Sequence, residues 1–385
     1  MAENISTCKA LGGGDFTSLA AWLAWAEVSG AKGETAECYD DGGTLGDCDM
    51  LVAWAAGTHV SSSDVARIIA AVGHEHGGDI NSGAEFGTIN NDALSYFELT
   101  NMKGERFSSV TGSTYTAIRS MIIKGNIIGY PSHPLGYNAL QIKSTGVGNP
   151  YGIQYTHTID NNIFIYANDD NTHNYVVRFY AVSPNNLNSY NQLHKFRNNL
   201  VIGNTHTISP VVMHRYVTNG WKAYISMDEF SNNMMFGGSS NSYLEYLQLG
   251  GGGSSAGTTL VTPESCLTSD ASADDSGGSN HQLNKTLAEC LVDYANSDFT
   301  LVEDGPAHNT GLTNDVTTDM LGVSRPDGIA FDMGPLELVI PTDVSTSFSS
   351  PTELLEAFDA APCIIPVELA VLIQLNKTIP VELLS

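Results

Sequence analysis

Four short segments in the middle of the chain share one arrangement of apolar and polar residues. In each, a few apolar residues lead into a polar turn that contains Asn, and further apolar residues follow. The shared positions are Asn126, Asn162, Asn199 and Asn233, which lie 36, 37 and 34 residues apart. A fixed period of this length indicates a repeat architecture. The four segments are residues 123–128, 159–164, 196–201 and 230–235.

A second apolar run follows each of the first three segments and recurs with the same period. These runs are residues 139–142, 175–179 and 211–215, and the connections between them are rich in Gly, Asn, Ser and Pro. The runs are short and bounded by turns, as strands are, and no helical pattern of about 10 to 15 residues comes between them. The sequence therefore predicts an all-β protein built as a parallel β-solenoid, in which each coil buries its apolar face against the next.

The repeated asparagines are expected at a bend between strands. Identical side chains that meet at strand spacing form ladders, in which each amide bonds to the coils above and below. We therefore interpret Asn126, Asn162, Asn199 and Asn233 as a structural ladder rather than as catalytic groups.

Residues 17–28 have the pattern of an amphipathic helix. Leu19, Trp22, Leu23, Trp25 and Ala26 would supply its apolar contacts, and Asp15 or Thr17 would cap its start. A solenoid must cover the open core of its first coil. The segment is therefore predicted to be an N-terminal helical cap.

Two sets of motifs carry a resemblance to a known group of proteins. The later set reads DFTLVEDGPAHNTG at 298–311, DMLGVSRPDG at 319–328 and FDMGPLE at 331–337. The earlier set is residues 14–22, 36–41 and 74–78. With this ordering the chain resembles right-handed parallel β-helix proteins of the pectate-lyase-like architecture, in particular a subset from phage and metagenomic genomes.

The resemblance covers residues 12–338 and implies the fold and its boundaries. Residues 298–311 would form the closing coil, and the chain departs from the usual pattern at Met333 and at Pro335-Leu336. Residues 1–58 would be the cap, 59–340 the right-handed parallel β-helix and 341–385 a C-terminal extension. Because this scaffold hosts lyases, hydrolases, tailspikes and purely structural proteins, the resemblance alone does not define an activity.

The net charge of the chain limits the kinds of molecule that it is expected to bind. With 42 acidic against 16 basic residues the formal net charge is -26, which excludes a nucleic-acid binder with a basic face. No apolar run reaches the roughly 18 residues of a membrane span, and the first residues show no secretion signal. The six cysteines form no C-x-x-C pair. Cys38 with Cys48, or Cys266 with Cys290, would close short loops as disulfides, but we favour buried reduced thiols.

Candidate catalytic groups are few. Asp169 and Asp170 are the best carboxylate pair for a glycoside hydrolase, although a loop Asp-Asp is usually a solvated turn. A polysaccharide lyase would need a basic residue, and calcium would suit it as a cofactor; no other cofactor is expected. The possible bases in the repeat region are Arg178, Lys195, Arg197 and Arg215.

Two further patterns suggest binding. His74 and His76 form an H-x-H pair that would share one strand face and hold a metal with Asp79. The glycines around them fit a turn equally well, and we favour that interpretation. Tyrosines that would form sugar-stacking platforms, or simply fill strand positions, are Tyr137, Tyr151, Tyr155, Tyr166, Tyr175 and Tyr180.

A different repeat begins after Pro341. Pro-x-Glu-Leu recurs with steps of 15 and 14 residues, and this repeat fits either short helical turns or an extended segment. Residues 364–375 carry one charge among many apolar groups. Left in water such a segment would aggregate. It would either pack back on its own solenoid or dock on another subunit, and we favour docking because a closed solenoid already has its own core. The predicted assembly residues are Pro351, Leu354, Ile364, Ile365, Pro366, Leu369, Leu372, Pro380 and Leu383.

These features favour a structural or adhesive component of a phage-like virion: a fibre, spike or surface decoration assembled in the host cytoplasm. Its partners would be further copies of itself or other virion proteins, with a host-surface polysaccharide as ligand. The first alternative is a polysaccharide lyase or glycoside hydrolase on the same scaffold. The second is a cell-surface adhesin or filament subunit.

Overall fold

The chain divides into two units, residues 1–339 and 340–385. The structure is a computed structural model, and it describes part of the chain. The predicted assembly residues after Pro341 and the predicted boundary at residues 58/59 lie outside the described residues. The described residues are 4–29, 34–50, 65–91, 96–111, 120–129, 138–145, 154–166, 175–183, 191–203, 209–217, 225–237, 244–249, 258–260, 262–273 and 278–340.

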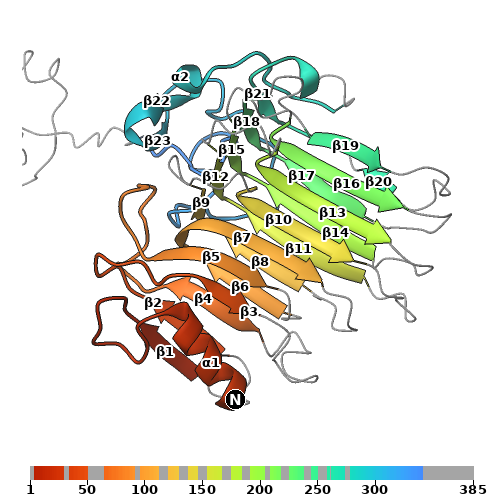
Figure 1. The fold of residues 1–385 in the computed structure, drawn as a ribbon. Helices are drawn as coiled ribbons and strands as arrows, with labels where there is room; N and C mark the ends of the chain where they lie inside the picture. Colours follow the sequence, from red (N-terminus) through yellow and green to blue (C-terminus); the bar gives the residue numbers. More distant parts are fainter. Residues whose placement is uncertain are drawn as a thin grey trace, which may run out of the picture. The chain divides into compact units, whose positions relative to one another are not determined.

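One sheet contains a strand from each successive coil, and all of its neighbouring strands are parallel (Figure 1). The strands follow one another in space in the order in which they occur along the chain. The order is β1 (Asn4–Cys8), β2 (Glu34–Cys38), β4 (Ala66–Ala70), β6 (Tyr96–Thr100), β8 (Ser120–Lys124), β11 (Gln154–Asp160), β14 (Asn191–Arg197), β17 (Ile225–Ser231) and β20 (Thr258–Leu260).

The second sheet has two limbs, which the long strand β7 (Lys103–Thr111) joins. On one limb β7 pairs with β9, and the short strands then pair in succession: β9 (Ile127–Ile128), β12 (Ile163–Ile165), β15 (Leu200–Ile202), β18 (Met234–Phe236) and β21 (Leu267–Thr268). On the other limb β7 pairs with β10, and the strands again pair in succession: β10 (Leu140–Thr145), β13 (Val177–Ser183), β16 (Val211–Val217) and β19 (Leu244–Leu249). Strand β5 (Glu85–Asn91) also pairs with β7, and β3 (Cys48–Met50) pairs with β5. The predicted parallel β-solenoid is confirmed.

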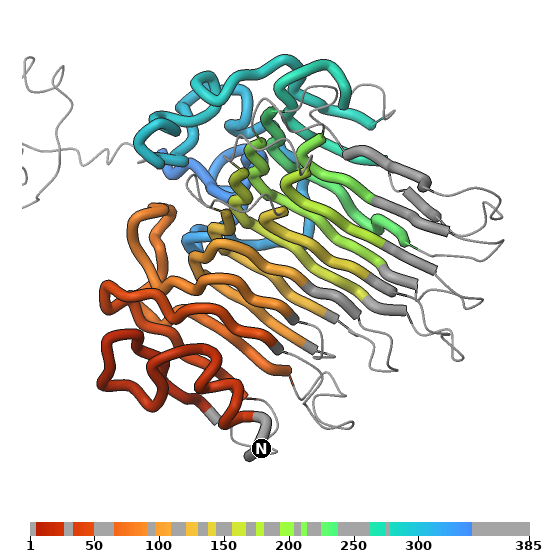
Figure 2. Tube along the Cα trace, in the orientation of Figure 1, coloured from red at the N-terminus to blue at the C-terminus, as the bar shows by residue number. Residues whose placement is uncertain are grey.

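The core consists of side chains that stack on their counterparts in the next coil. Phe196 on β14 and Phe230 on β17 are paired in register and fully buried, and their rings stack with centroids 5.5 Å apart. Phe164 on β12 of the second sheet is also fully buried, and its ring stacks on that of Phe196 with centroids 6.0 Å apart. Equivalent side chains stack because parallel pairing places equivalent positions of the sequence repeat side by side, at the spacing of neighbouring strands. Figure 2 shows the regular succession of coils along the Cα trace.

The repeated asparagines lie at the bend between the first sheet and the short strands. Asn126, Asn162, Asn199 and Asn233 are fully buried. The Oδ1 atom of each of the last three accepts hydrogen bonds from both the backbone N–H and the Nδ2 of the preceding member, at 2.9–3.2 Å. The row ends at Met102, whose backbone N–H donates to Asn126 Oδ1 at 2.9 Å.

The residue before each of these asparagines adopts a left-handed backbone conformation. Asn161, Asn198 and Asn232 have φ of 54°, 52° and 55°, and Gly125 takes the same place in its coil with φ of 64°. Asn and Gly are the residues that tolerate this region best. The Asn-Asn pairs of the sequence therefore combine a turn residue with a buried hydrogen-bonding residue.

Helix α1 (Leu19–Ser29) begins two residues later than the sequence pattern suggests. Ser18 caps it, since Ser18 Oγ accepts from the backbone N–H of Ala21 at 3.1 Å. The predicted cap at Asp15 or Thr17 is wrong, because the Asp15 carboxylate instead accepts two hydrogen bonds from Thr7. Trp22 is fully buried, whereas Trp25 is exposed and contacts Phe16 with its ring.

The end of the solenoid differs from the closing coil that the resemblance implies. Helix α2 (Leu287–Cys290) leads into strands β22 (Leu291–Asp293) and β23 (Asp298–Leu301), which pair antiparallel around a short 3-10 helix (Tyr294–Asn296). The reversal occurs at Ser297, whose φ is 65°. The five described cysteines (Cys8, Cys38, Cys48, Cys266 and Cys290) are buried and form no disulfide, as expected.

We predict that Asn199→Ala lowers the free energy of unfolding by about 2–4 kcal/mol, because it removes the acceptor for the buried N–H of Asn162 and the donor to Ile159 O. Urea unfolding followed by circular dichroism measures the loss. The matched control is Asn198→Gly, which keeps the left-handed turn and removes one side-chain hydrogen bond, from Asn314, so that it should cost only about 1 kcal/mol. Equal losses in the two variants would contradict the ladder interpretation.

Candidate functional site

A row of polar side chains runs along one edge of the first sheet. Thr100, Lys124, Asp160 and Arg197 are paired in register on β6, β8, β11 and β14, and each is the last residue of its strand. Each stands directly before the turn that carries the left-handed residue. We call these four residues the polar edge. Its members of opposite charge lie next to each other, which favours ion pairing along the solenoid.

A later segment, residues 311–322, lies along this edge, and we call it the C-terminal strap. The turn asparagines hold it in place. Asn232 exchanges two hydrogen bonds with the backbone of Leu312, at 2.6 and 2.7 Å, and Asn161 Nδ2 donates to Thr318 O at 2.7 Å. Asn314 Nδ2 donates to Asn198 Oδ1 at 3.2 Å. The turn asparagines thus serve both the bend and the attachment of the strap.

Three carboxylates surround Arg197 where the strap crosses the polar edge. The guanidinium binds both oxygens of Asp160, at 3.0 and 2.7 Å, and Glu229 Oε2 at 2.9 Å, and it also contacts Asp315 of the strap. Burial raises the pKa of Asp160, although the bonds from Arg197 oppose this. Burial lowers the pKa of Arg197, but the hydrogen bonds and charge of Asp160 raise it overall, so Arg197 stays protonated. Both oxygens of Asp160 are bound to a permanent cation, so it is a poor general acid or base.

The residues that carry the resemblance near the end of the chain form a second buried polar cluster. Arg325 binds Glu337 Oε2 at 2.9 Å and donates to the carbonyl oxygens of Asp332 and Gly334. Asp319 accepts from the backbone N–H groups of residues 321, 323 and 337, at 2.8 to 3.0 Å. These motif residues therefore fix the strap and the segment after it.

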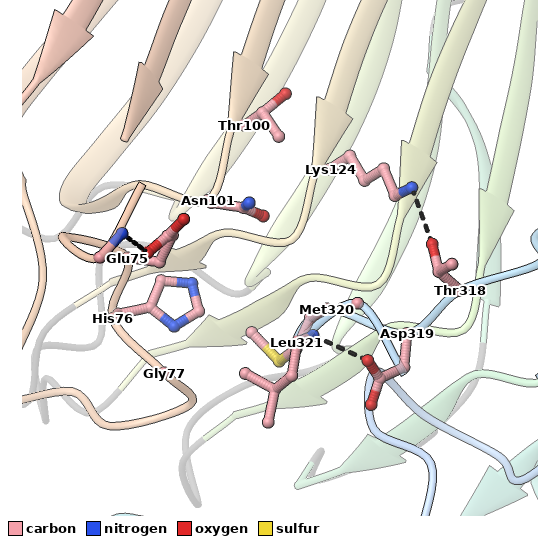
Figure 3. Close-up of a pocket in the computed structure, with 12 residues that line it drawn as sticks. Glu75, His76, Gly77, Thr100, Asn101, Lys124, Thr318, Asp319, Met320 and Leu321 are labelled. Carbon is pink, nitrogen blue, oxygen red and sulfur yellow. Dashed lines mark hydrogen bonds between the residues drawn. The ribbon is translucent and has the colours of Figure 1, made fainter. Parts of the chain in front are cut away.

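A groove opens between the strap and the loop that contains His76 (Figure 3). Its volume is about 540 Å³. Lys124 lies at one side of it, and its Nζ donates to Thr318 Oγ1 at 3.3 Å. Glu75 on the loop accepts from the backbone N–H of Gly73 at 2.7 Å. The lining residues are Gly73, Glu75, His76, Gly77, Thr100, Asn101, Lys124 and residues 318–322.

The residues of the predicted metal site are held by hydrogen bonds of a turn. His76 is buried; its Nδ1 accepts from the N–H of Gly78 at 3.0 Å, so Nε2 carries the proton that it donates to Gly125 O at 2.7 Å. Burial also lowers the pKa of His76. His74 Nδ1 lies 3.1 Å from Asp40 O, and Asp79 Oδ1 accepts twice from Asn81.

With both nitrogens bonded to backbone, the His76 ring offers no lone pair to a metal. Within the described ranges, no three His, Cys, Asp or Glu side chains come together as metal ligands. The loop thus has the turn structure that its glycines favour, in which His74, His76 and Asp79 make separate hydrogen bonds.

The other predicted catalytic residues do not come together in the groove. Asp169 and Asp170 lie outside the described residues. Arg178 on β13 is half-buried, with its guanidinium 4.5 Å from the ring centroid of Tyr180, and burial lowers its pKa. Of Arg215 only the backbone is described, on β16 beside Ala181. Tyr166 is buried and cannot serve as a surface platform.

Sequence reasoning missed the polar edge and the groove that lies at its end. The repeat does contain a signal, because Lys124, Asp160 and Arg197 each stand two residues before a ladder asparagine. Their alternating charge is visible once the segments are aligned. The contribution of Thr318 and Asp315 has no such signal, because more than a hundred residues separate the strap from the strands it touches.

No protein-family model, curated protein or solved structure matches this chain. None of the helices in the described ranges has the length and apolar character that a membrane-spanning segment needs.

We predict that Arg197→Met lowers the free energy of unfolding by about 3–5 kcal/mol at neutral pH, because it leaves the Asp160 charge buried without a partner. The double variant Asp160→Asn with Arg197→Met should recover more than half of this loss, since no unpaired charge remains. Chemical unfolding of the three proteins measures both effects. A double variant as unstable as the single one would show that the ion pair does not govern this edge.

Proposed function

We propose that this protein is a structural or adhesive component of a phage-like particle, displayed as a fibre, spike or surface decoration. The observation that carries the proposal is that the buried charged groups of the polar edge, of the strap and of the segment after it are bound to one another or to backbone. Asp160 is bound to Arg197, Asp319 to three backbone N–H groups, and Arg325 to Glu337. Such groups stabilise a rigid scaffold and are not available for acid–base chemistry.

The architecture supports the presentation of surface loops at fixed positions. Backbone pairing and the asparagine ladder run from coil to coil, so each coil is fixed by its neighbours on both sides. The net charge of -26 gives such a repetitive β surface a repelling exterior that opposes aggregation. The right-handedness and the capping role of α1 belong to this proposal, and the phage-like setting rests on the sequence resemblance. The virion would be its location.

The adhesive role would use the groove beside the strap. Lys124, Thr318, Thr100 and Asn101 offer an ammonium group, hydroxyls and an amide, which are the groups that bind sugar hydroxyls and carboxylates. The natural ligand of this site would be a host-surface polysaccharide. A glycoside hydrolase would instead need a pair of available carboxylates about 5 to 10 Å apart. Of the two carboxylates that line the groove, Asp319 is engaged by backbone N–H groups through both oxygens.

Assembly would depend on the segment after residue 340. Its Pro-x-Glu-Leu repeat and the apolar residues 364–375 are sequence features that fit docking on another copy or on another virion protein.

We predict that removal of residues 341–385 leaves the far-ultraviolet circular dichroism of the solenoid unchanged and abolishes self-association and incorporation into particles. The substitution of Leu369 and Leu372 by Asp in the full-length protein should have the same effect, since it places charge in the apolar segment. Multi-angle light scattering and particle incorporation measure the outcome. A full-length double variant with unchanged mass and incorporation would exclude the assembly role.

We predict that the protein binds a surface oligosaccharide without shortening it, and that Lys124→Gln weakens binding about tenfold, which corresponds to one charge-assisted hydrogen bond. Lys143→Gln is the matched control, because Lys143 lies on β10 beside the Tyr180 ring. Glycan-array binding and the chain length of acidic and neutral bacterial polysaccharides are the measurements. Depolymerisation by the wild-type protein would favour the lyase or hydrolase alternative, and equal binding by Lys124→Gln would exclude the groove.

A further inference from the structure

Two histidines lie inside the solenoid without a hydrogen-bond partner. His157 on β11 and His194 on β14 are fully buried, and neither ring nitrogen of either residue has a partner among the described residues. Their rings stack with centroids 5.0 Å apart and planes 28° apart. Buried polar groups are almost always hydrogen-bonded, so four unpaired nitrogens in one core call for a physical explanation.

Only apolar groups of the described core surround the pair. β11 and β14 pair in register, so the two histidines occupy the same inward position in neighbouring coils. The coils on either side carry Met121 on β8 and Met227 on β17 at that position. From the opposite sheet, the Phe179 ring has its centroid 4.3 Å from that of His194. The position is therefore a core position at which the chain itself uses Met elsewhere.

The described charged side chains on the surrounding strands lie on outer faces or at strand ends. The inward positions of these strands belong to the buried apolar residues of the core. The side chains of His214 and Arg215 on β16 are outside the described part. The charged residues described on β8, β10, β11, β13, β14 and β17 are Lys124, Lys143, Asp160, Arg178, Lys195, Arg197, Asp228 and Glu229.

Protonation of this pair would place charge in an apolar core. Burial alone lowers the pKa of His157 to about 3, and burial together with the neighbouring His157 lowers the pKa of His194 well below its usual value. Two imidazolium ions at this distance would also repel each other. The folded state therefore holds both rings neutral, whereas the unfolded chain protonates them near pH 6.5.

We propose that the stacked, unpartnered His157 and His194 form an acid-responsive switch in the solenoid, which holds the β11 and β14 coils together at neutral pH and loosens them in acid. The trigger is proton uptake by the two rings when the coils open to water. The switch does not depend on the proposed function. It would, however, let a particle component change state in an acidic compartment.

The direction of the effect follows from proton linkage. Because the folded pKa values lie below the unfolded ones, the full stabilising effect of the neutral pair is present above about pH 6.5 and declines as the pH falls. Each histidine contributes up to about a tenfold change in the unfolding equilibrium constant for each pH unit below that point. The two together contribute up to about a hundredfold per pH unit until the pH approaches about 3, the folded pKa of His157.

The test compares the pH dependence of unfolding in the wild type and in the double variant His157→Met with His194→Met. Met is the residue that the neighbouring coils carry at this position. Met227→Leu is the matched control, because it changes the same core stack without removing a titratable group. Urea unfolding followed by circular dichroism between pH 7.5 and 4.5 gives the equilibrium constant of each protein.

We expect the unfolding constant of the wild type, divided by that of the double variant, to rise by a factor of up to about 10⁴ as the pH falls from 6.5 to 4.5. The unfolding constant of the wild type, divided by that of Met227→Leu, should stay the same over this range. Parallel pH curves for the wild type and the double variant would overturn the proposal, since other groups would then account for any acid sensitivity.

Hydrogen exchange of the wild-type protein tests the same switch without a substitution, should the double variant fail to fold. Rates at pH 7.5 and 5.0, corrected for the intrinsic effect of pH, are compared between peptides that cover β11 and β14 and one that covers β2. A selective loss of protection in β11 and β14 at pH 5.0 supports the switch. Equal changes in all three strands, or no change, would overturn it.

Discussion

The structure depends on the hydrogen bonds that the backbone N–H groups make at one bend of the coil. At this bend the chain leaves the first sheet, and a backbone N–H must be buried without a strand beside it. The side-chain oxygen of the asparagine in the next coil accepts from that N–H, and the preceding residue takes the left-handed conformation that makes the bend. An unsatisfied N–H at each of these bends would cost about 1–3 kcal/mol per coil, so the asparagine ladder contributes a large part of the stability of the coils that contain it.

The same bend organises the outside of the molecule. Because the bends align, the last residues of successive strands form the polar edge, and the turn asparagines present amides to the strap. The strap in turn buries the Asp160–Arg197 ion pair, so removal of one partner would leave an uncompensated charge. Asp160 and Arg197, which are bound to each other, are therefore unsuited to acid–base catalysis.

Much of the fold could be predicted from the sequence, because the same order of strand, turn and buried asparagine recurs about every 36 residues. The positions of Asn126, Asn162, Asn199 and Asn233 follow from local pattern alone. The groove could not be predicted in this way, since Lys124 and Thr318 meet only after the chain has passed the end of the solenoid and returned. The H-x-H pattern suggested a metal site because the spacing of two ligands can be recognised along the chain. One backbone partner of His76, the carbonyl of Gly125, lies in another coil, so the sequence around His76 does not reveal it. His157 and His194 each stand five residues before a ladder asparagine, so the repeat aligns them, but the polar neighbours Thr156, Thr158 and Lys195 give no signal that the two rings are buried.

The most direct test of this account is amide hydrogen exchange at single-residue resolution. The backbone N–H groups of Asn126, Asn162 and Asn199 donate to side-chain oxygens rather than to a strand, yet they should exchange as slowly as those of the central strands β11 and β14 at neutral pH. Exchange at the rate of an exposed turn would contradict the claim that the ladder holds the coils together.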